Sequence, residues 1–227
     1  MGNFAWGPLN VKKWNISPVV FIVSCVVTFL IRVYLAHFGY NFDLDSFRIV
    51  ADLMQQGKNV YINTDRYNYA PVWMWILYFI KLVSFSHFRY AVAAFISLVD
   101  VAIAIVLYKR GNKLASLLIL YSPVCAIISG YHNQFDNLAI LIGLLAVRYA
   151  ETRKNYAPKG LSGLSMKEIV IFALLLGISI STKHVLIFFP FWFLFMSGLK
   201  FQQRLVLVFL PIVLFFRILP PLFKCTA

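Results

Sequence analysis

Residues 40–71 have the sequence YNFDLDSFRIVADLMQQGKNVYINTDRYNYAP and form the longest polar interruption in an otherwise apolar chain. The stretch contains four of the eight acidic residues: Asp43, Asp45, Asp52 and Asp65. Asp43 and Asp45 follow directly after the first long apolar segment, and carboxylates at such a membrane boundary are often functional. Both also stand where a helix would begin, so we keep two interpretations open for each: a functional carboxylate and a helix cap.

The composition indicates a membrane protein. Hydrophobic residues make up 61% of the chain, the mean hydropathy is +0.80, and apolar runs near membrane-spanning length recur. The net charge is +13, and the basic residues cluster between apolar runs, as in loops on the inner side of a membrane. We expect membrane lipids as partners and no nucleic acid. The three cysteines show neither metal-ligand spacing nor a disulfide framework.

The first apolar segment, residues 17–36, is too long for the core of a signal peptide, and no cleavage site follows it. We expect a membrane anchor whose N-terminus is inside, with Arg32 extending its charge toward the outer surface. Residues 46–57 carry apolar side chains at helical spacing. This predicts a short amphipathic helix on the membrane, capped by Asp45 or Ser46 and ended by Gly57.

Residues 71–85 are an ambiguous apolar segment, interrupted by Lys81 and rich in interfacial aromatic residues. If the segment does not cross the membrane, the inner loops hold 12 of the 21 lysines and arginines; if it does cross, the bias reverses. We therefore predict a juxtamembrane helix. The expected fold is an all-α polytopic membrane protein with about seven transmembrane helices, the later six at 90–108, 114–129, 137–149, 168–182, 184–198 and 204–220.

This topology gives one transmembrane domain over residues 1–227, with an outer loop at 37–89 and six spans within 90–220. It places GYHNQFDN (130–137) and STKH (181–184) on the same face as Asp43 and Asp45. The predicted localisation is an integral, multi-pass membrane protein with a cytoplasmic N-terminus. Its first long loop lies outside the cell, or in the lumen of the endoplasmic reticulum in a eukaryote.

The segment GYHNQFDN places His132, Asn133, Gln134 and Asp136 in one turn between two apolar segments. Such a turn either terminates a helix, capped by Asn133 or Asp136, or hydrogen-bonds to a sugar or phosphate. Lys183 also lies between two apolar segments, where a lysine either extends to the surface or meets an anion. Because carboxylates are expected on the same face, a phosphate partner is favoured.

Tyr67 and Tyr69 precede Pro71, which suits the start of a helix. They fit either an interfacial aromatic belt or stacking against a sugar. Asp100 lies inside an apolar run and needs a partner or a proton, and we assign it no catalytic role. The sequence contains no Gly-rich phosphate loop, no HExxH, no CxxC and no nucleophilic-serine motif. We expect no cofactor and no metal.

Four segments together resemble the GT-C superfamily of membrane glycosyltransferases: FDLDSFRIVADLMQQGKNVY (42–61), RYNYAP (66–71), GYHNQFDN and STKH. The chain is most similar to polyprenyl-phosphate-mannose-dependent mannosyltransferases, including the bacterial family 87 enzymes and the mannosyltransferase of glycosylphosphatidylinositol assembly. The His-x-x-Phe pattern of HNQF also resembles the glucosyltransferases that extend dolichol-linked oligosaccharides. Family members are usually much longer, so we expect the shared N-terminal seven-span module alone, with a C-terminal module supplied by a partner subunit or missing.

The resemblance implies a role for each candidate residue. A catalytic aspartate is expected in the first outer loop, where Asp43 matches best and Asp45 second. The implied donor is a sugar on a polyprenyl phosphate. Its phosphate would meet Lys183, with help from His184 or Arg66. Sugar or acceptor contacts would come from the GYHNQFDN turn and the tyrosine turn, through His132, Asn133, Gln134, Asp136, Tyr67 and Tyr69.

The expected function is transfer of a hexose, mannose first, from a polyprenyl-phosphate donor to a hydroxyl of a lipid or glycan acceptor. The transfer inverts the anomeric centre, with an aspartate as general base. The alternative is a non-catalytic membrane protein, either a piece of a transporter or a lipid-binding partner subunit. A transporter would more often place its ionisable residues in the middle of the membrane, where only Asp100 clearly lies.

Overall fold

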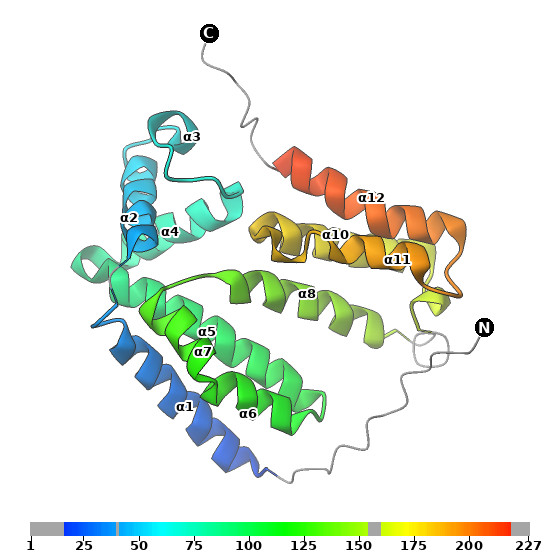
Figure 1. Cartoon of the computed structure of the whole chain (residues 1–227), viewed down its shortest axis with the longest axis horizontal. Coiled ribbons are helices and arrows are strands. Elements are labelled where there is room, and N and C mark those ends of the chain that lie inside the picture. Colours follow the sequence, from blue (N-terminus) through cyan, green and yellow to red (C-terminus); the bar gives the residue numbers. More distant parts are fainter. Residues whose placement is uncertain (1–15, 40, 154–159, 219–227) are drawn as a thin grey trace.

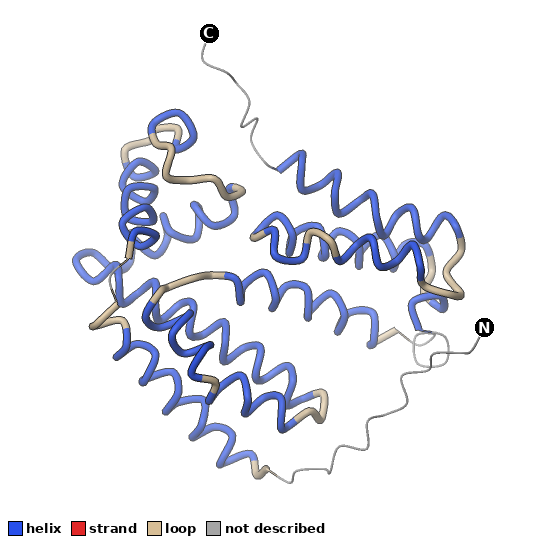
Figure 2. The backbone as a smooth tube through the Cα atoms, in the orientation of Figure 1, coloured by secondary structure: helices blue, strands red, loops and turns tan. Residues whose placement is uncertain are grey.

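The computed structural model describes residues 16–39, 41–153 and 160–218. Within these ranges every regular element is a helix, and no strand occurs (Figure 2). The all-α class predicted from the sequence is therefore confirmed. The longer helices are α1 (Pro18–Leu35), α2 (Phe42–Gln55), α4 (Pro71–Ser84), α5 (Phe88–Lys109), α6 (Lys113–Tyr121), α8 (Asp136–Glu151), α10 (Met166–Thr182) and α12 (Phe201–Ile218). The short elements are α3 (Val60–Asn63), η1 (Phe85–His87), α7 (Pro123–Ala126), η2 (Ile127–Tyr131), η3 (Gly160–Gly163), η4 (His184–Leu186), η5 (Phe189–Phe191) and α11 (Trp192–Phe195).

The helices form three packed groups (Figure 1). One contains α1, α5 and α6, a second contains α8, α10, α11 and α12, and the third contains α2, α3 and α4. Each group has its own apolar core, and α8 lies between α5 and α10. Phe135, at the start of α8, is fully buried in the core that α2 and α4 share with the beginning of α5. The segment leading into α8 is therefore where the groups meet.

Helix α2 is the predicted amphipathic helix, and it begins earlier than expected. Its buried residues include Leu44, Phe47 and Val50, whose spacing places them on one face. The N-cap is Asn41, whose Oδ1 accepts a hydrogen bond of 2.9 Å from the Leu44 backbone. The prediction that Asp45 or Ser46 caps this helix is therefore wrong. The helix ends before Gly57, as predicted, and Gly57 has a φ of +67° that few other residues adopt.

Two described helices, α1 and α5, are long and apolar enough to cross a membrane, and their positions match two predicted spans. A third is obtained if α6 and the segment Pro123–Tyr131 are one span bent by 49°. The bend follows from Pro123, which has no backbone N–H to continue the ladder of α6. Beyond it, the chain forms a π-helical turn over Ile127–Tyr131. These features are compatible with a membrane protein.

The segment 184–198 differs from the continuous helix predicted there. The helix α10 ends at Thr182, and Lys183 is extended, with φ −155° and ψ 135°. The chain then continues as η4, η5 and α11, which are separate short turns. Pro190 lies within η5 and cannot donate a backbone hydrogen bond, which explains why no long helix forms here.

Helix α4 matches the segment predicted to be juxtamembrane. It has 14 residues, which correspond to a length of about 21 Å. A bilayer core is about 30 Å thick. One side of α4 buries Trp73, Leu77 and Ile80 against α2 and α5, while Trp75 and Phe79 remain exposed. The helix α4 is therefore a short apolar helix with one side packed in the core and the other exposed.

The stacked pair of Trp73 and Phe135 should be a principal stabilising contact of the α2–α4 core. The two rings are 4.1 Å apart and nearly parallel, and both side chains are fully buried. We expect Trp73→Ala to lower the free energy of unfolding by about 3–5 kcal/mol, measured by thermal or denaturant unfolding in detergent. The control is Trp75→Ala on the exposed side of α4, for which we expect less than about 1 kcal/mol. Equal effects of the two substitutions would contradict this packing.

Candidate functional site

The candidate site is built around the first turn of α2. Because Asn41 caps this helix, the Asp43 side chain is held on its first turn. The Nδ2 atom of Asn41 also donates a hydrogen bond of 2.6 Å to the backbone oxygen of His132. Asn41 therefore ties the start of α2 to the segment before α8. This contact brings the DLD motif and the GYHNQFDN motif together.

A chain of polar contacts connects Asp43 to Lys183. The Nε2 atom of Gln134 donates a short hydrogen bond to Asp43 Oδ2. Lys183 Nζ donates to Gln134 Oε1 at 3.0 Å and to Asp136 Oδ2 at 2.8 Å. Gln134 thus uses both ends of its amide and orients the Asp43 carboxylate. The other carboxylate oxygen of Asp43 accepts no hydrogen bond from the described residues.

Lys183 is placed by the end of α10 and by aromatic rings. Its side chain is only 11% exposed. Its Nζ lies 4.8 Å from the centre of the Phe135 ring and 5.6 Å from that of Tyr69, distances at which a cation is attracted to the ring face. The ammonium group is therefore largely shielded from water, and the Asp136 carboxylate balances its charge.

An open cavity of about 430 Å³ adjoins Asp43. It is lined by Phe42, Asp43, Ser46, Phe47, Asp65, Arg66, Asn68 and Tyr69. The guanidinium of Arg66 lies 4.3 Å from the centre of the Phe42 ring, so a second cation borders this space. The lining combines two carboxylates, one cation, amide and hydroxyl groups and aromatic rings. Such a combination suits a polar ligand that carries hydroxyl groups.

Tyr69 contributes both a ring and a protonated hydroxyl to this site. Burial raises the pKa of the Tyr69 hydroxyl, and the negative charges of Asp43 and Asp136 raise it further. The hydroxyl therefore remains a hydrogen-bond donor at any physiological pH. Its ring packs edge-on against Phe135, with centres 5.0 Å apart. Phe135 in turn stacks on Trp73, which gives the site a rigid aromatic base.

The structure distinguishes the two carboxylates that the sequence left as alternatives. Asp43 lines the cavity, whereas Asp45, two residues along the same helix, does not. Residues two positions apart on a helix point about 200° away from each other, so Asp43 and Asp45 face different sides of α2. Among the predicted residues, those in or beside this space are Asp43, Arg66, Tyr69, Gln134, Asp136 and Lys183.

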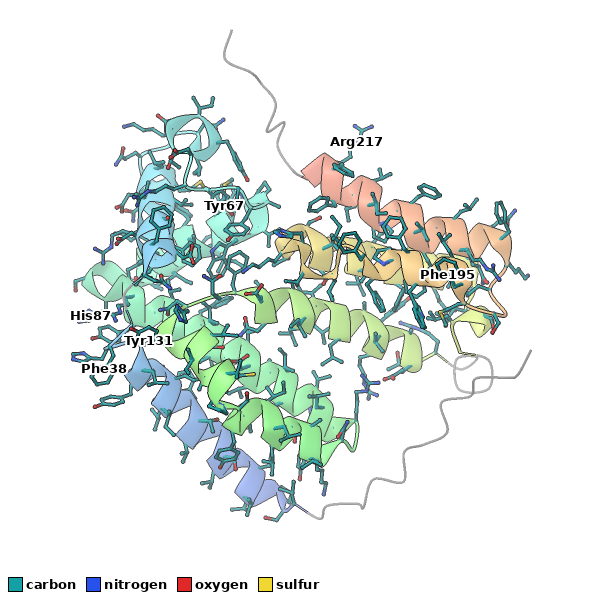
Figure 3. The ribbon with its side chains drawn as sticks, viewed as in Figure 1. Phe38, Tyr67, His87, Tyr131, Phe195 and Arg217 are labelled. Carbon is teal, nitrogen blue, oxygen red and sulfur yellow. The ribbon has the colours of Figure 1, made fainter. Side chains whose placement is uncertain are left out.

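Four predicted ligand residues neither line the cavity nor belong to the chain of contacts from Asp43 to Lys183. Tyr67 is 3% exposed, and its hydroxyl donates to the Ala70 backbone oxygen at 2.8 Å (Figure 3). Asn133 is buried with a φ of +56°, and its Nδ2 donates to the Tyr131 backbone oxygen. His132 is exposed and close to Asn41 at the edge of the site. His184 is exposed, and its side chain has no hydrogen bond to the described residues.

Sequence reasoning missed several residues that shape the site. Asn41 was overlooked although Asn immediately before an amphipathic pattern is a common helix cap. Asp65 and Asn68 flank the predicted Arg66–Tyr67 pair and line the cavity. The interpretation of Asn133 or Asp136 as a cap of α8 is wrong, because no side chain caps that helix. Asp136 instead pairs with Lys183.

The search for metal-binding groups in the part of the chain that the structure describes and the comparisons with known proteins gave no match. Among the described residues, no group of three or more His, Cys, Asp or Glu side chains is arranged to hold a metal ion. No family model, curated protein or solved structure matches the chain.

The two tyrosines of the turn before α4 should respond differently to loss of the hydroxyl. We expect Tyr67→Phe to lower the free energy of unfolding by about 1 kcal/mol or more, because the buried Ala70 carbonyl loses its donor. The matched control is Tyr69→Phe, whose hydroxyl makes no hydrogen bond to the described residues, and we expect it to be near neutral. Thermal unfolding in detergent measures both. A larger loss for Tyr69→Phe would contradict these assignments.

Proposed function

We propose that this chain is a membrane glycosyltransferase of the GT-C type that moves a hexose, mannose first, from a polyprenyl phosphate to an acceptor hydroxyl. The observation that carries the proposal is the chain of contacts Asp43–Gln134–Lys183 beside an open polar cavity. Asp43 faces this space, and its second carboxylate oxygen accepts no hydrogen bond from the described residues. A poorly exposed cation, Lys183, is connected to it through Gln134. A general base and a nearby cation both favour transfer from a phosphate leaving group.

The proposed step is a single displacement. The acceptor oxygen attacks the anomeric carbon while its proton passes to Asp43. The bond from the anomeric carbon to the phosphate oxygen breaks, and the electron pair leaves with the lipid phosphate. Lys183 stabilises the charge that grows on this phosphate, and Arg66 at the cavity wall is placed to assist. Gln134 fixes the Asp43 carboxylate, and Tyr69 offers a ring and a donor to the sugar.

An apolar groove near Lys183 supports a lipid-linked donor. It runs between α8, α10 and the short elements that follow Lys183, and it consists of adjoining cavities of about 230 and 180 Å³. Val147, Phe172 and Phe189 line both. Leu186, three residues after Lys183, lines the first. A phosphate held at Lys183 would thus have a dry path for its isoprenoid chain immediately beside it.

The transporter alternative has less support. A transporter would more often place ionisable residues in the middle of the membrane, and only Asp100 clearly lies there in the sequence. Asp100 is instead paired with Arg32 at 3.2 Å and is 3% exposed, so it is engaged in the fold rather than open to an ion path.

Asp43→Asn should abolish sugar transfer while the protein remains folded. We expect a loss of about a hundredfold or more, since the amide cannot accept the acceptor's proton. Membranes containing the chain receive radiolabelled polyprenyl-phosphate mannose, and label is followed into lipid, glycan and water. Asp45→Asn, on the same helix but outside the cavity, is the matched control and should retain transfer. Transfer lost with Asp45→Asn and kept with Asp43→Asn would overturn the assignment.

The proposed seven-span topology places the site outside the membrane, with α4 not crossing. We expect a cysteine at Lys58, exposed after α2, to react with an impermeant maleimide added to intact cells. A cysteine at Lys109, exposed at the end of α5, should react only after the membrane is opened. Both are tested in a background without the native cysteines. Equal labelling of the two positions from outside would show that α4 crosses the membrane and would disprove the topology.

A further inference from the structure

Arg32 and Asp100 form an ion pair inside the helix bundle. The Arg32 side chain is 1% exposed, and its Nε lies 3.2 Å from Asp100 Oδ2. The expectation that Arg32 extends to the membrane surface is therefore wrong. Its terminal nitrogens donate to three backbone oxygens, those of Thr28 at 3.1 Å, Ile119 at 2.9 Å and Leu120 at 2.8 Å. The bonds to Ile119 and Leu120 join α1 to the end of α6.

Asp100 accepts hydrogen bonds from residues at both ends of the segment that leads into α8. Ser129 Oγ, in the π-helical turn, donates a short hydrogen bond to Asp100 Oδ2. Asn137 Nδ2, in the first turn of α8, donates to Asp100 Oδ1 at 2.9 Å and to the Ile96 backbone oxygen at 2.8 Å. Ser129 and Asn137 bracket residues 130–136, which carry Gln134 and Asp136. We call residues 130–136 the bracketed loop.

The backbone of the bracketed loop also rests directly on α1. A Cβ atom on Gly130 would lie 2.6 Å from the Arg32 backbone oxygen, and one on Gly39 would lie 2.0 Å from the Tyr131 backbone oxygen. Any larger residue at either position would separate the two backbones. Figure 3 shows Tyr131 beside this end of α1. The Arg32 backbone therefore packs directly against the loop at Gly130, and the Arg32 side chain is connected to both ends of the loop through Asp100.

Stability alone does not account for such a pair. Removing two charges from water costs about as much free energy as their attraction returns, so apolar residues of similar size are often equally stable there. The pair does supply fixed positions, because its hydrogen bonds with Ile119, Leu120, Ser129 and Asn137 each link two different elements. The elements fixed are those on either side of the loop that orients Asp43.

We propose that Arg32 and Asp100 are positioning residues of the candidate site. They hold both ends of the bracketed loop, so that Gln134 reaches Asp43 and Lys183 at the same time. This inference rests on the proposed function for its effect on turnover. Its geometric part, that the ion pair sets the distance between Gln134 and Asp43, stands independently of the reaction.

The test replaces both charges together, by Arg32→Met with Asp100→Leu, so that no unpaired charge is left in the bundle. We expect the double variant to fold, and to lose between about tenfold and about a hundredfold in kcat with little change in KM for the donor. The control double variant is Arg110→Met with Glu151→Leu. It removes the ion pair between Arg110, just after α5, and Glu151, at the end of α8, away from the bracketed loop, and should leave kcat unchanged.

A second readout needs no activity. Asp43→Cys and Gln134→Cys are combined in a background without native cysteines, and a short thiol cross-linker is applied. We expect efficient cross-linking that falls several-fold with Arg32→Met and Asp100→Leu and is unaffected by the control pair. If that variant does not fold, Ser129→Ala, which removes one hydrogen bond and keeps the ion pair, should reduce cross-linking by a smaller amount.

The two readouts separate the proposals. Unchanged cross-linking in the folded Arg32–Asp100 variant, or in Ser129→Ala if the double variant does not fold, would overturn the positioning role whether or not the chain transfers sugar. A loss of cross-linking in a chain that transfers no sugar would support the positioning role and count against the proposed function alone.

Discussion

A charged side chain buried among apolar helices needs a partner of opposite charge, and Arg32 is paired with Asp100. Around this pair gather α1, α5, the end of α6, the π-helical turn and the start of α8. Each contributes either a charged group or a hydrogen-bond partner, so the pair is fully surrounded. The helices of the first group cannot shift relative to α8 without breaking a buried polar contact, which is costly in such a medium.

The segment that enters α8 transmits this constraint to the surface. At its two ends, Ser129 and Asn137 make polar contacts with Asp100. Its aromatic residue, Phe135, is instead buried against Trp73 in the core that α2 and α4 share. Between these two anchors the chain presents Gln134 and Asp136 outward. A short segment held by an ion-pair network on one side and by stacked rings on the other has little freedom. Such rigid support is what a site that must hold reacting groups in register needs.

The site joins residues from three distant parts of the chain. Asp43 comes from the first turn of a helix, Gln134 from a loop and Lys183 from the end of another helix. Three of the four motifs picked out in the sequence do supply these groups, and the tyrosine turn supplies Tyr69. The individual roles were less predictable. Tyr67 and Asn133 proved to be buried structural residues, because a tyrosine or asparagine in a turn satisfies its own backbone as readily as a ligand.

Local patterns in the sequence were enough to predict the helical class, the approximate bounds of most helices and the amphipathic α2. These follow from periodicity, caps and charge bias, which are local properties of the chain. Three features became clear from the folded chain alone: Arg32 is buried against Asp100, Asp43 rather than Asp45 lines the cavity, and residues 184–198 break into short turns. These outcomes depend on which helix faces meet and on how closely two backbones approach, as at Gly130. No local pattern records that distance.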